Sequence, residues 1–167
     1  GSRLLADWLA SPLTELDAPP EVTAAAPLIT GNLITGNTTV REGGGLFVEI
    51  SSSGTGTGPT ITNNTVYKNR ATAGDGRRAG GLFVRSDIDP DEPNDPPILF
   101  SVTRNLFYDN QGGPGISSCD VIELPSGSIA GNLVFANEGG EVACPVGTNT
   151  VADPLFCDYA SGNITLC

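Results

Sequence analysis

The sequence predicts an all-β fold, organised as a solenoid of parallel strands that follows a short helical segment. Three observations predict it: 22 Gly and 13 Pro among 167 residues, a short Asn-containing motif that recurs four times, and the same order of parts after each copy. Gly and Pro favour turns over helix interiors, and the length suits one domain. A unit this small cannot bury its own apolar face, whereas stacked copies can.

The first 26 residues contain no copy of the motif. Leu5 and Leu9 are four positions apart, with Trp8 beside Leu9, which is the spacing of one face of a helix. Helices this short are unstable alone. We therefore expect the segment 1–26 either to cap the solenoid formed by 27–167 or to dock on a neighbouring molecule, with Leu5, Trp8 and Leu9 as its anchor.

From residue 27 on, the motif consists of an aliphatic residue, two residues, Asn, one residue, an apolar residue, two residues and a second Asn. A Gly-rich stretch and a short apolar segment follow each copy. The core of the unit is constant, whereas the connecting loops differ in length. The four copies are Ile29 to Asn37, Ile61 to Asn69, Val102 to Asn110 and Ile129 to Asn137.

Each coil is expected to contain three short strands: one at the first aliphatic residue, one just after the first Asn, and one in the Gly-apolar segment. Asn suits the bend between the first two strands, because it tolerates left-handed backbone angles and carries both a donor and an acceptor. Coils stacked about 4.8 Å apart bring equivalent side chains together. We therefore expect one buried ladder of side-chain amides, formed by Asn32, Asn64, Asn105 and Asn132.

With these motifs the sequence resembles the right-handed parallel β-helix family, the pectate-lyase-like solenoids with their asparagine ladder. Its ending, with Asp153-Pro154-Leu155-Phe156-Cys157 and then 162–167, is similar to the closing segment of secreted bacterial β-helix proteins of unassigned function. The resemblance implies a right-handed parallel β-helix of about five coils, secreted or held at the cell surface. Its last strand, at 164–166, would be an open edge.

Four cysteines lie in the last third of the chain, without a C-x-x-C pair and without His. Disulfides formed in an oxidising compartment are therefore favoured over a zinc site. Three pairings are possible. Cys119 and Cys144 are expected to follow the third strands of neighbouring coils, which favours a bond between them. Cys157 and Cys167 would then close the final coil.

The third strands also predict a ligand groove. Alternation along these strands directs every second side chain to the core and the others outward. Phe47 and Phe83 would then face outward on adjacent coils, with Glu49 and Arg85 beside them. Exposed rings can stack on a sugar or on a protein partner. The alternative is a ring-to-ring contact that a loop covers.

Asp87, Asp89 and Asp91 have the alternating spacing that calcium loops use, although the Gly and the late Glu of such loops are absent. Ca²⁺ is thus a candidate ligand, and a solvated acidic loop is the alternative. The family resemblance implies either polysaccharide lyases, which use Ca²⁺ with an Arg base, or hydrolases with paired carboxylates. Arg85 is the candidate base.

The composition excludes several functions. Without His, imidazole-based triads and His-ligated metal sites are excluded. The net charge of −11 argues against nucleic acid or an anionic membrane as partner, and no apolar run is long enough to cross a bilayer. Asp109, Glu138 and Glu141 lie in loops where a carboxylate pair could form, but no spacing singles them out.

We therefore predict a secreted, non-catalytic structural or adhesive module that associates head to tail with copies of itself into fibres. The alternative is a carbohydrate-binding or polysaccharide-cleaving module that acts through the groove.

Overall fold

A computed structural model describes most of the repeat region, and all regular structure in the described residues is β-strand. The segment 1–26, with Leu5, Trp8 and Leu9, lies outside these residues, so its helices and its docking role stay predictions. The described ranges are 27–50, 57–72, 78–86, 99–120, 128–143, 147–158 and 163–166.

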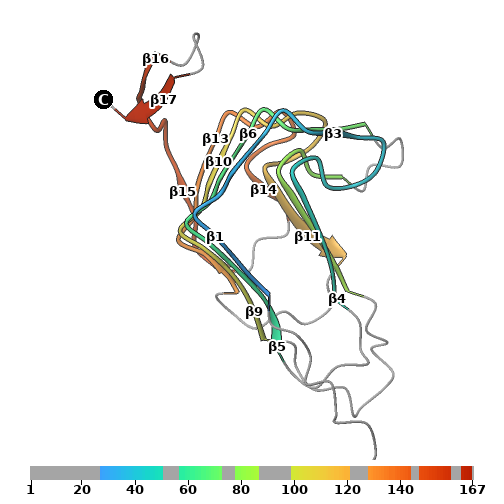
Figure 1. The fold of residues 1–167 in the computed structure, drawn as a ribbon. Coiled ribbons are helices and arrows are strands. Elements are labelled where there is room, and N and C mark those ends of the chain that lie inside the picture. Colours follow the sequence, from blue (N-terminus) through green and yellow to red (C-terminus); the bar gives the residue numbers. More distant parts are fainter. Residues whose placement is uncertain are drawn as a thin grey trace, which may run out of the picture.

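Most strands belong to three parallel sheets, and each sheet takes one strand from each of the first four coils (Figure 1). The first sheet contains β1 (Leu28–Thr30), β5 (Thr57–Thr62), β9 (Leu99–Thr103) and β12 (Ile129–Ala130). The second contains β2 (Leu33–Thr35), β6 (Thr65–Tyr67), β10 (Leu106–Tyr108), β13 (Leu133–Phe135) and β15 (Thr150–Val151). The third contains β4 (Leu46–Ile50), β8 (Leu82–Ser86), β11 (Ile116–Asp120) and β14 (Val142–Ala143).

The register between strands follows the repeat. Ile29 pairs with Ile61, and Val102 pairs with Ile129, so equivalent motif positions lie on top of one another. A further short parallel pair, β3 (Thr38–Thr39) with β7 (Arg70–Ala71), joins the first two coils beyond the second sheet. Stacked parallel strands in motif register are the arrangement expected of a parallel β-helix.

Three columns of side chains form the core between the sheets. Ile61, Val66 and Leu82 of the second coil are fully buried, as are their equivalents in the third coil. In the first coil the same positions, Ile29 and Ile34, are only partly buried, because a neighbouring coil covers them on one side alone. Burial therefore increases from the first coil to the centre of the stack.

The bends differ from the sequence prediction in one detail. The residue with the left-handed backbone is the one before each Asn, as at Asn63 (φ 55°), Arg104 (φ 57°) and Ala136 (φ 56°), and Gly31 and Gly36 take the same conformation. The ladder Asn itself keeps negative φ, because its side chain must point along the stack to the next Asn. Asn is thus selected here for its amide and not for its backbone freedom.

The glycines before the third strands fill a packing role. A Cβ on Gly45 would lie 2.8 Å from Val66 Cγ1, and a Cβ on Gly81 would lie 2.8 Å from Phe107 Cδ1. Only a residue without Cβ allows the chain to pass so close to the core column of the second sheet. This contact explains why a Gly-rich stretch precedes each third strand.

The end of the chain departs from the predicted fifth coil. β15 adds a fifth strand to the second sheet, but the strands that follow, β16 (Phe156–Asp158) and β17 (Asn163–Leu166), pair antiparallel with each other. This hairpin lies apart from the three sheets (Figure 1). The predicted last strand at 164–166 is present, but it pairs antiparallel with β16 and does not stack as a parallel strand on the preceding coil; among the described strands it is terminal in this two-stranded sheet.

Pro154 explains where the repeat stops. It lies five residues after Asn149, the position at which every earlier coil has its second Asn, and it is buried. Pro has no backbone N–H and no side-chain amide, so it cannot continue the pattern. Phe156, the first residue of the hairpin, packs edge-on against Tyr108 of the second sheet, with ring centroids 5.1 Å apart.

Candidate functional site

The predicted asparagine ladder is present, and one further residue extends it. In each step the side-chain Nδ2 of one Asn donates to Oδ1 of the Asn in the next coil, and the backbone N–H donates to the same oxygen. The Nδ2 to Oδ1 distances are 3.0, 3.0, 3.0 and 2.9 Å along the column Asn32, Asn64, Asn105, Asn132 and Asn149. Asn32 is exposed, so the prediction of a buried ladder is wrong for its first member.

A second ladder runs parallel to the first at the other end of the second sheet. It passes through Asn37, Asn69, Asn110 and Asn137 with the same donor and acceptor pattern. Sequence reasoning missed this ladder, although the second Asn of the motif recurs as regularly as the first. Its last member, Asn137, donates from Nδ2 to Glu141 Oε2 at 2.8 Å. The carboxylate of Glu141 thus replaces the amide oxygen of a further coil.

The ladders have a direction, so the two ends of the stack differ chemically. Every Asn donates toward the next coil and accepts from the previous one. Within the described part of the chain, no donor reaches Oδ1 of Asn32 or Asn37. At the other end, Asn149 Oδ1 accepts from Asn132, and its Nδ2 donates back to the Ile129 carbonyl of the preceding coil at 3.1 Å. The first coil is therefore an acceptor end, and Asn149 is the last amide of the ladder, with no described residue that continues it.

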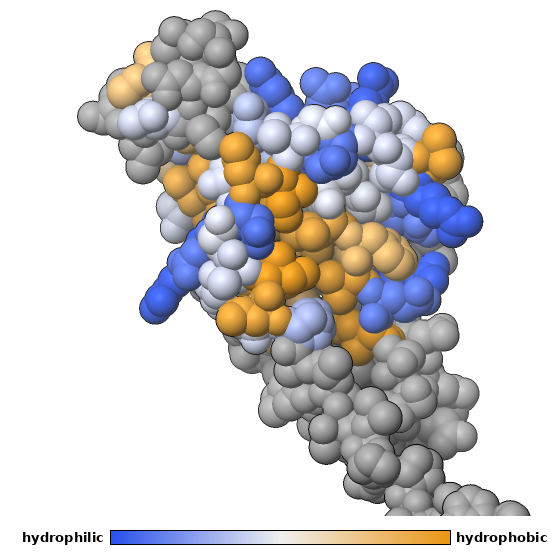
Figure 2. All heavy atoms as spheres, viewed as in Figure 1, coloured by the Kyte–Doolittle hydropathy of each residue, from blue (hydrophilic) through white to orange (hydrophobic). Residues whose placement is uncertain are grey.

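The outer side of the first coil is also apolar. We define the N-terminal face as Leu28, Ile29, Leu33, Ile34 and Leu46. Leu28 is 64% exposed and Leu33 is 55% exposed, and the other three are partly buried core residues. The view down the stack in Figure 2 shows apolar side chains gathered in the space that the three sheets enclose. Strands β1, β2 and β4 are terminal in their sheets, so no described strand pairs with their outer edges on this face.

The structure brings the predicted groove residues together in pairs. Phe47 pairs with Phe83 and Glu49 with Arg85 across β4 and β8. The two rings stack with centroids 6.1 Å apart and planes 4° from parallel. Phe83 is only 1% exposed, because Phe47 lies on one side of it and Ser117 is its strand partner on the other. The prediction that Phe83 faces solvent is wrong, and the alternative of a ring-to-ring contact is what the structure shows.

Arg85 is held by carboxylates. Its Nη2 pairs with Glu49 Oε1, and its Nη1 lies 3.9 Å from Glu42 Oε1. The guanidinium also lies over the Phe47 ring, with Cζ 5.5 Å from the centroid. Two carboxylates and an aromatic ring thus surround the guanidinium, and the role of Arg85 as a base stays a prediction. Phe47, Glu49 and Arg85 keep exposed surface here, whereas Phe83 does not.

The predicted metal ligands Asp87, Asp89 and Asp91 lie outside the described residues. Among the residues that are described, no group of three Asp, Glu or Cys side chains is placed to hold a metal ion. Ca²⁺ binding therefore stays a prediction.

The cysteines are described only in part. Cys157 is disulfide-bonded. Cys119 lies within β11 and not after it, and its side chain, like Cys144 and Cys167, falls outside the described set. The pairing of Cys119 with Cys144 and of Cys157 with Cys167 stays a prediction. Because β16 and β17 form a hairpin, the bond of Cys157 cannot close a fifth coil as expected.

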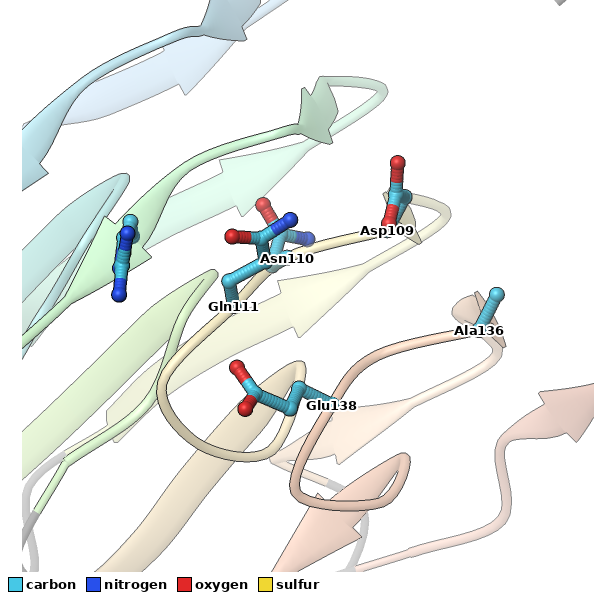
Figure 3. A pocket seen from close by; sticks show the side chains of 6 residues that line it. Asp109, Asn110, Gln111, Ala136 and Glu138 are labelled. Atoms are coloured by element: carbon cyan, nitrogen blue, oxygen red, sulfur yellow. The ribbon is translucent and has the colours of Figure 1, made fainter.

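A polar surface pocket of about 390 Å³ lies where the chain leaves the second sheet (Figure 3). Gln111 and Glu138 each follow a member of the second ladder, so they stack in one column with Arg70. Glu138 Oε2 accepts a hydrogen bond from the Gly112 N–H at 2.6 Å. The complete lining is Arg70, Asp109, Asn110, Gln111, Ala136 and Glu138. The pocket offers one cation, two carboxylates and the carboxamide of Gln111 to a hydrophilic ligand, because the buried Asn110 amide is engaged in the second ladder.

Tyr108 forms an aromatic column on the outside of the second sheet. Its ring stacks on Phe135 with centroids 6.1 Å apart and meets Phe156 edge-on. Burial raises the pKa of the Tyr108 hydroxyl above its ordinary value, and the carboxylates of Asp153 and Asp109 raise the pKa further. The hydroxyl is therefore neutral at physiological pH.

No family model, curated protein or solved structure matches this chain. In the part of the chain that is described, there is no helix with the length and apolar character needed to span a membrane.

Proposed function

We propose that the chain is a structural module with a right-handed parallel β-helix fold, secreted or held at the cell surface, which associates end to end with copies of itself. The observation that carries this proposal is the direction of the asparagine ladder. Asn32 Oδ1 receives no donor from a described residue at one end, and Asn149 at the other end is the last amide of the ladder, with no described residue that continues it. A copy whose first coil stacks on the fifth coil of another would extend the ladder by one step.

The N-terminal face supports the same proposal. Burying a leucine side chain stabilises an association by about 1.5–3 kcal/mol, and Leu28 and Leu33 are both largely exposed. Val151 of β15 is 61% exposed at the opposite end and offers an apolar surface to meet them. Open strand edges add backbone donors and acceptors that a second copy can satisfy. Contact between unlike ends does not close on itself and generates fibres.

The interface is asymmetric along its width. The first ladder is open at Asn149, whereas Glu141 and Pro154 end the second ladder within the chain. Contact at the last coil would therefore be centred on β15 and Asn149. The net charge of −11 opposes association, so screening by salt is expected to strengthen it.

Analytical ultracentrifugation and electron microscopy of the full chain test the proposal. Mass should rise with protein concentration and with NaCl, and particles should elongate. Leu33→Lys places a charge on the N-terminal face and should abolish the rise. Val40→Lys is the control, because Val40 is also exposed, at 80%, in the same coil but lies beyond β3. A strictly monomeric wild-type chain at high concentration and high salt would refute the proposal.

The second candidate is a carbohydrate-binding module. The observation that favours it is the pocket between Arg70 and Glu138, since hydroxyl groups bind to such mixed donor and acceptor sets. The groove first predicted for this role is largely filled by its own residues. Calorimetric titration of acidic and neutral oligosaccharides, with Ca²⁺ and with EDTA, tests this function. Loss of binding in Arg70→Ala, with binding retained in Phe47→Ala, would locate the ligand in the pocket.

A further inference from the structure

We propose that the N-terminal face binds the leading segment of the same chain, with Leu5, Trp8 and Leu9 in contact with it. The leading segment, residues 1–17, would then compete with a second copy for this face. The competition rests on the proposed function, whereas the docking itself does not.

The N-terminal face presents both apolar side chains and hydrogen-bond acceptors to a binding partner. It combines the apolar side chains of Leu28, Leu33 and Ile34 with the acceptor oxygens of Asn32 and Asn37. A fitting partner therefore brings apolar side chains together with a few N–H donors.

The leading segment has this chemistry. Leu5 and Leu9 repeat at helical spacing, and Trp8 adds a large apolar ring with a single N–H donor and no acceptor. Trp8 is the one Trp of the chain, so its environment can be measured without labels.

The connection allows the docking. The Thr60 N–H donates to the Pro27 carbonyl at 2.9 Å, so the repeat register already holds the chain at residue 27, on the edge of the face. The spacer 18–26 is rich in Ala and Pro and spans up to about 30 Å when extended. Packed sheets are about 10 Å apart, so the segment reaches across the face. A short tether also gives a millimolar effective concentration, which favours the chain's own segment over a second copy.

Tryptophan fluorescence of the full chain tests the docking. At low protein concentration, emission should lie at short wavelength, and acrylamide should quench it several-fold less than free N-acetyl-tryptophanamide. Leu33→Lys should shift the emission to longer wavelength and restore quenching, whereas Val151→Lys at the far end should leave both unchanged. Far-ultraviolet circular dichroism confirms that each variant is folded. Solvent-exposed Trp8 in the wild-type chain would overturn the proposal, whatever the variants do.

Sedimentation of Trp8→Ser separates the two proposals. If the segment competes for the face, this variant should assemble at several-fold lower concentration than the wild type. Protected Trp8 without assembly in either protein would support the docking and refute the proposed function. Exposed Trp8 in a protein that does assemble would refute the docking alone. Protection that appears only as concentration rises would assign the segment to a second copy and overturn the intramolecular contact.

Discussion

Removing one central amide from the first ladder is expected to destabilise the protein strongly. The Asn105 side chain is 2% exposed and takes part in five hydrogen bonds. It accepts from the N–H and Nδ2 of Asn64 at 2.9 and 3.0 Å. It donates to the Ile61 and Thr103 carbonyls at 2.9 and 3.0 Å and to Asn132 Oδ1 at 3.0 Å.

The magnitude follows from the groups that lose their partner in Asn105→Ala. The Asn64 backbone N–H loses its acceptor inside the stack, and a buried unsatisfied group costs about 1–3 kcal/mol. The other contacts are shared with further partners and contribute about 1 kcal/mol each at most. We expect the free energy of unfolding to fall by about 3–5 kcal/mol.

Asn32→Ala is the matched control, because Asn32 has the same turn and the same ladder position at the exposed end. Its amide donates to Asn64 Oδ1 and Thr30 O, but no described residue donates to its oxygen. The expected loss is about 1 kcal/mol or less. Urea unfolding followed by circular dichroism measures both variants, with unchanged m-values as the check on two-state behaviour. Equal losses at the two positions would refute the reasoning that burial and ladder position set the cost.

Three further predictions concern conformation and ionisation. Ala136→Gly relieves a left-handed alanine (φ 56°) and should stabilise the fold by about 0.5–1 kcal/mol in the same urea assay; a loss of stability would contradict the strain. Asn105→Asp keeps the acceptor oxygen but replaces Nδ2 with a second oxygen, which faces three acceptor oxygens. The pKa of the new carboxyl should therefore be raised in the folded state, and the Asn105→Asp protein should lose stability as pH rises above about 4. The raised pKa of Tyr108 means that the folded state retains its proton longer, so stability should fall as pH rises above about 10, and Tyr108→Phe should remove this part of the loss; an ultraviolet titration showing tyrosinate at the ordinary pKa would disagree.

The sequence was sufficient to predict the coils, because the motif contains both the apolar residues of the core and the polar residues of the turn. Ile61 and Val102 lie where the pattern places them, and Asn64 and Asn105 form the predicted ladder. The same motif contained the second ladder, which was missed because only the first Asn was assigned to a bend. The left-handed backbone conformation was also predicted for the wrong residue: it was assigned to the Asn, but the residue before the Asn adopts it.

The groove and the chain end could not be predicted from local pattern alone. Alternation correctly places Phe83 on the opposite side of β8 from Leu82 and Val84, but it does not say what covers that side. Burial of Phe83 depends on Phe47 and Ser117, which are contributed by other coils. The antiparallel pair β16 and β17 follows Pro154, and the place of Pro154 in the pattern can be seen only once the ladder register is known.

The constant spacing of the two ladders has a consequence for how the stack comes apart. Every complete coil has five residue steps from its first Asn to its second, while the loops outside this segment vary. Each coil therefore exchanges hydrogen bonds only with its two neighbours, so the stability of one coil is coupled directly only to the coils next to it in the stack. We expect unfolding to begin at the terminal coils and to advance inward one coil at a time, so that the central coil, which contains Phe107, unfolds last.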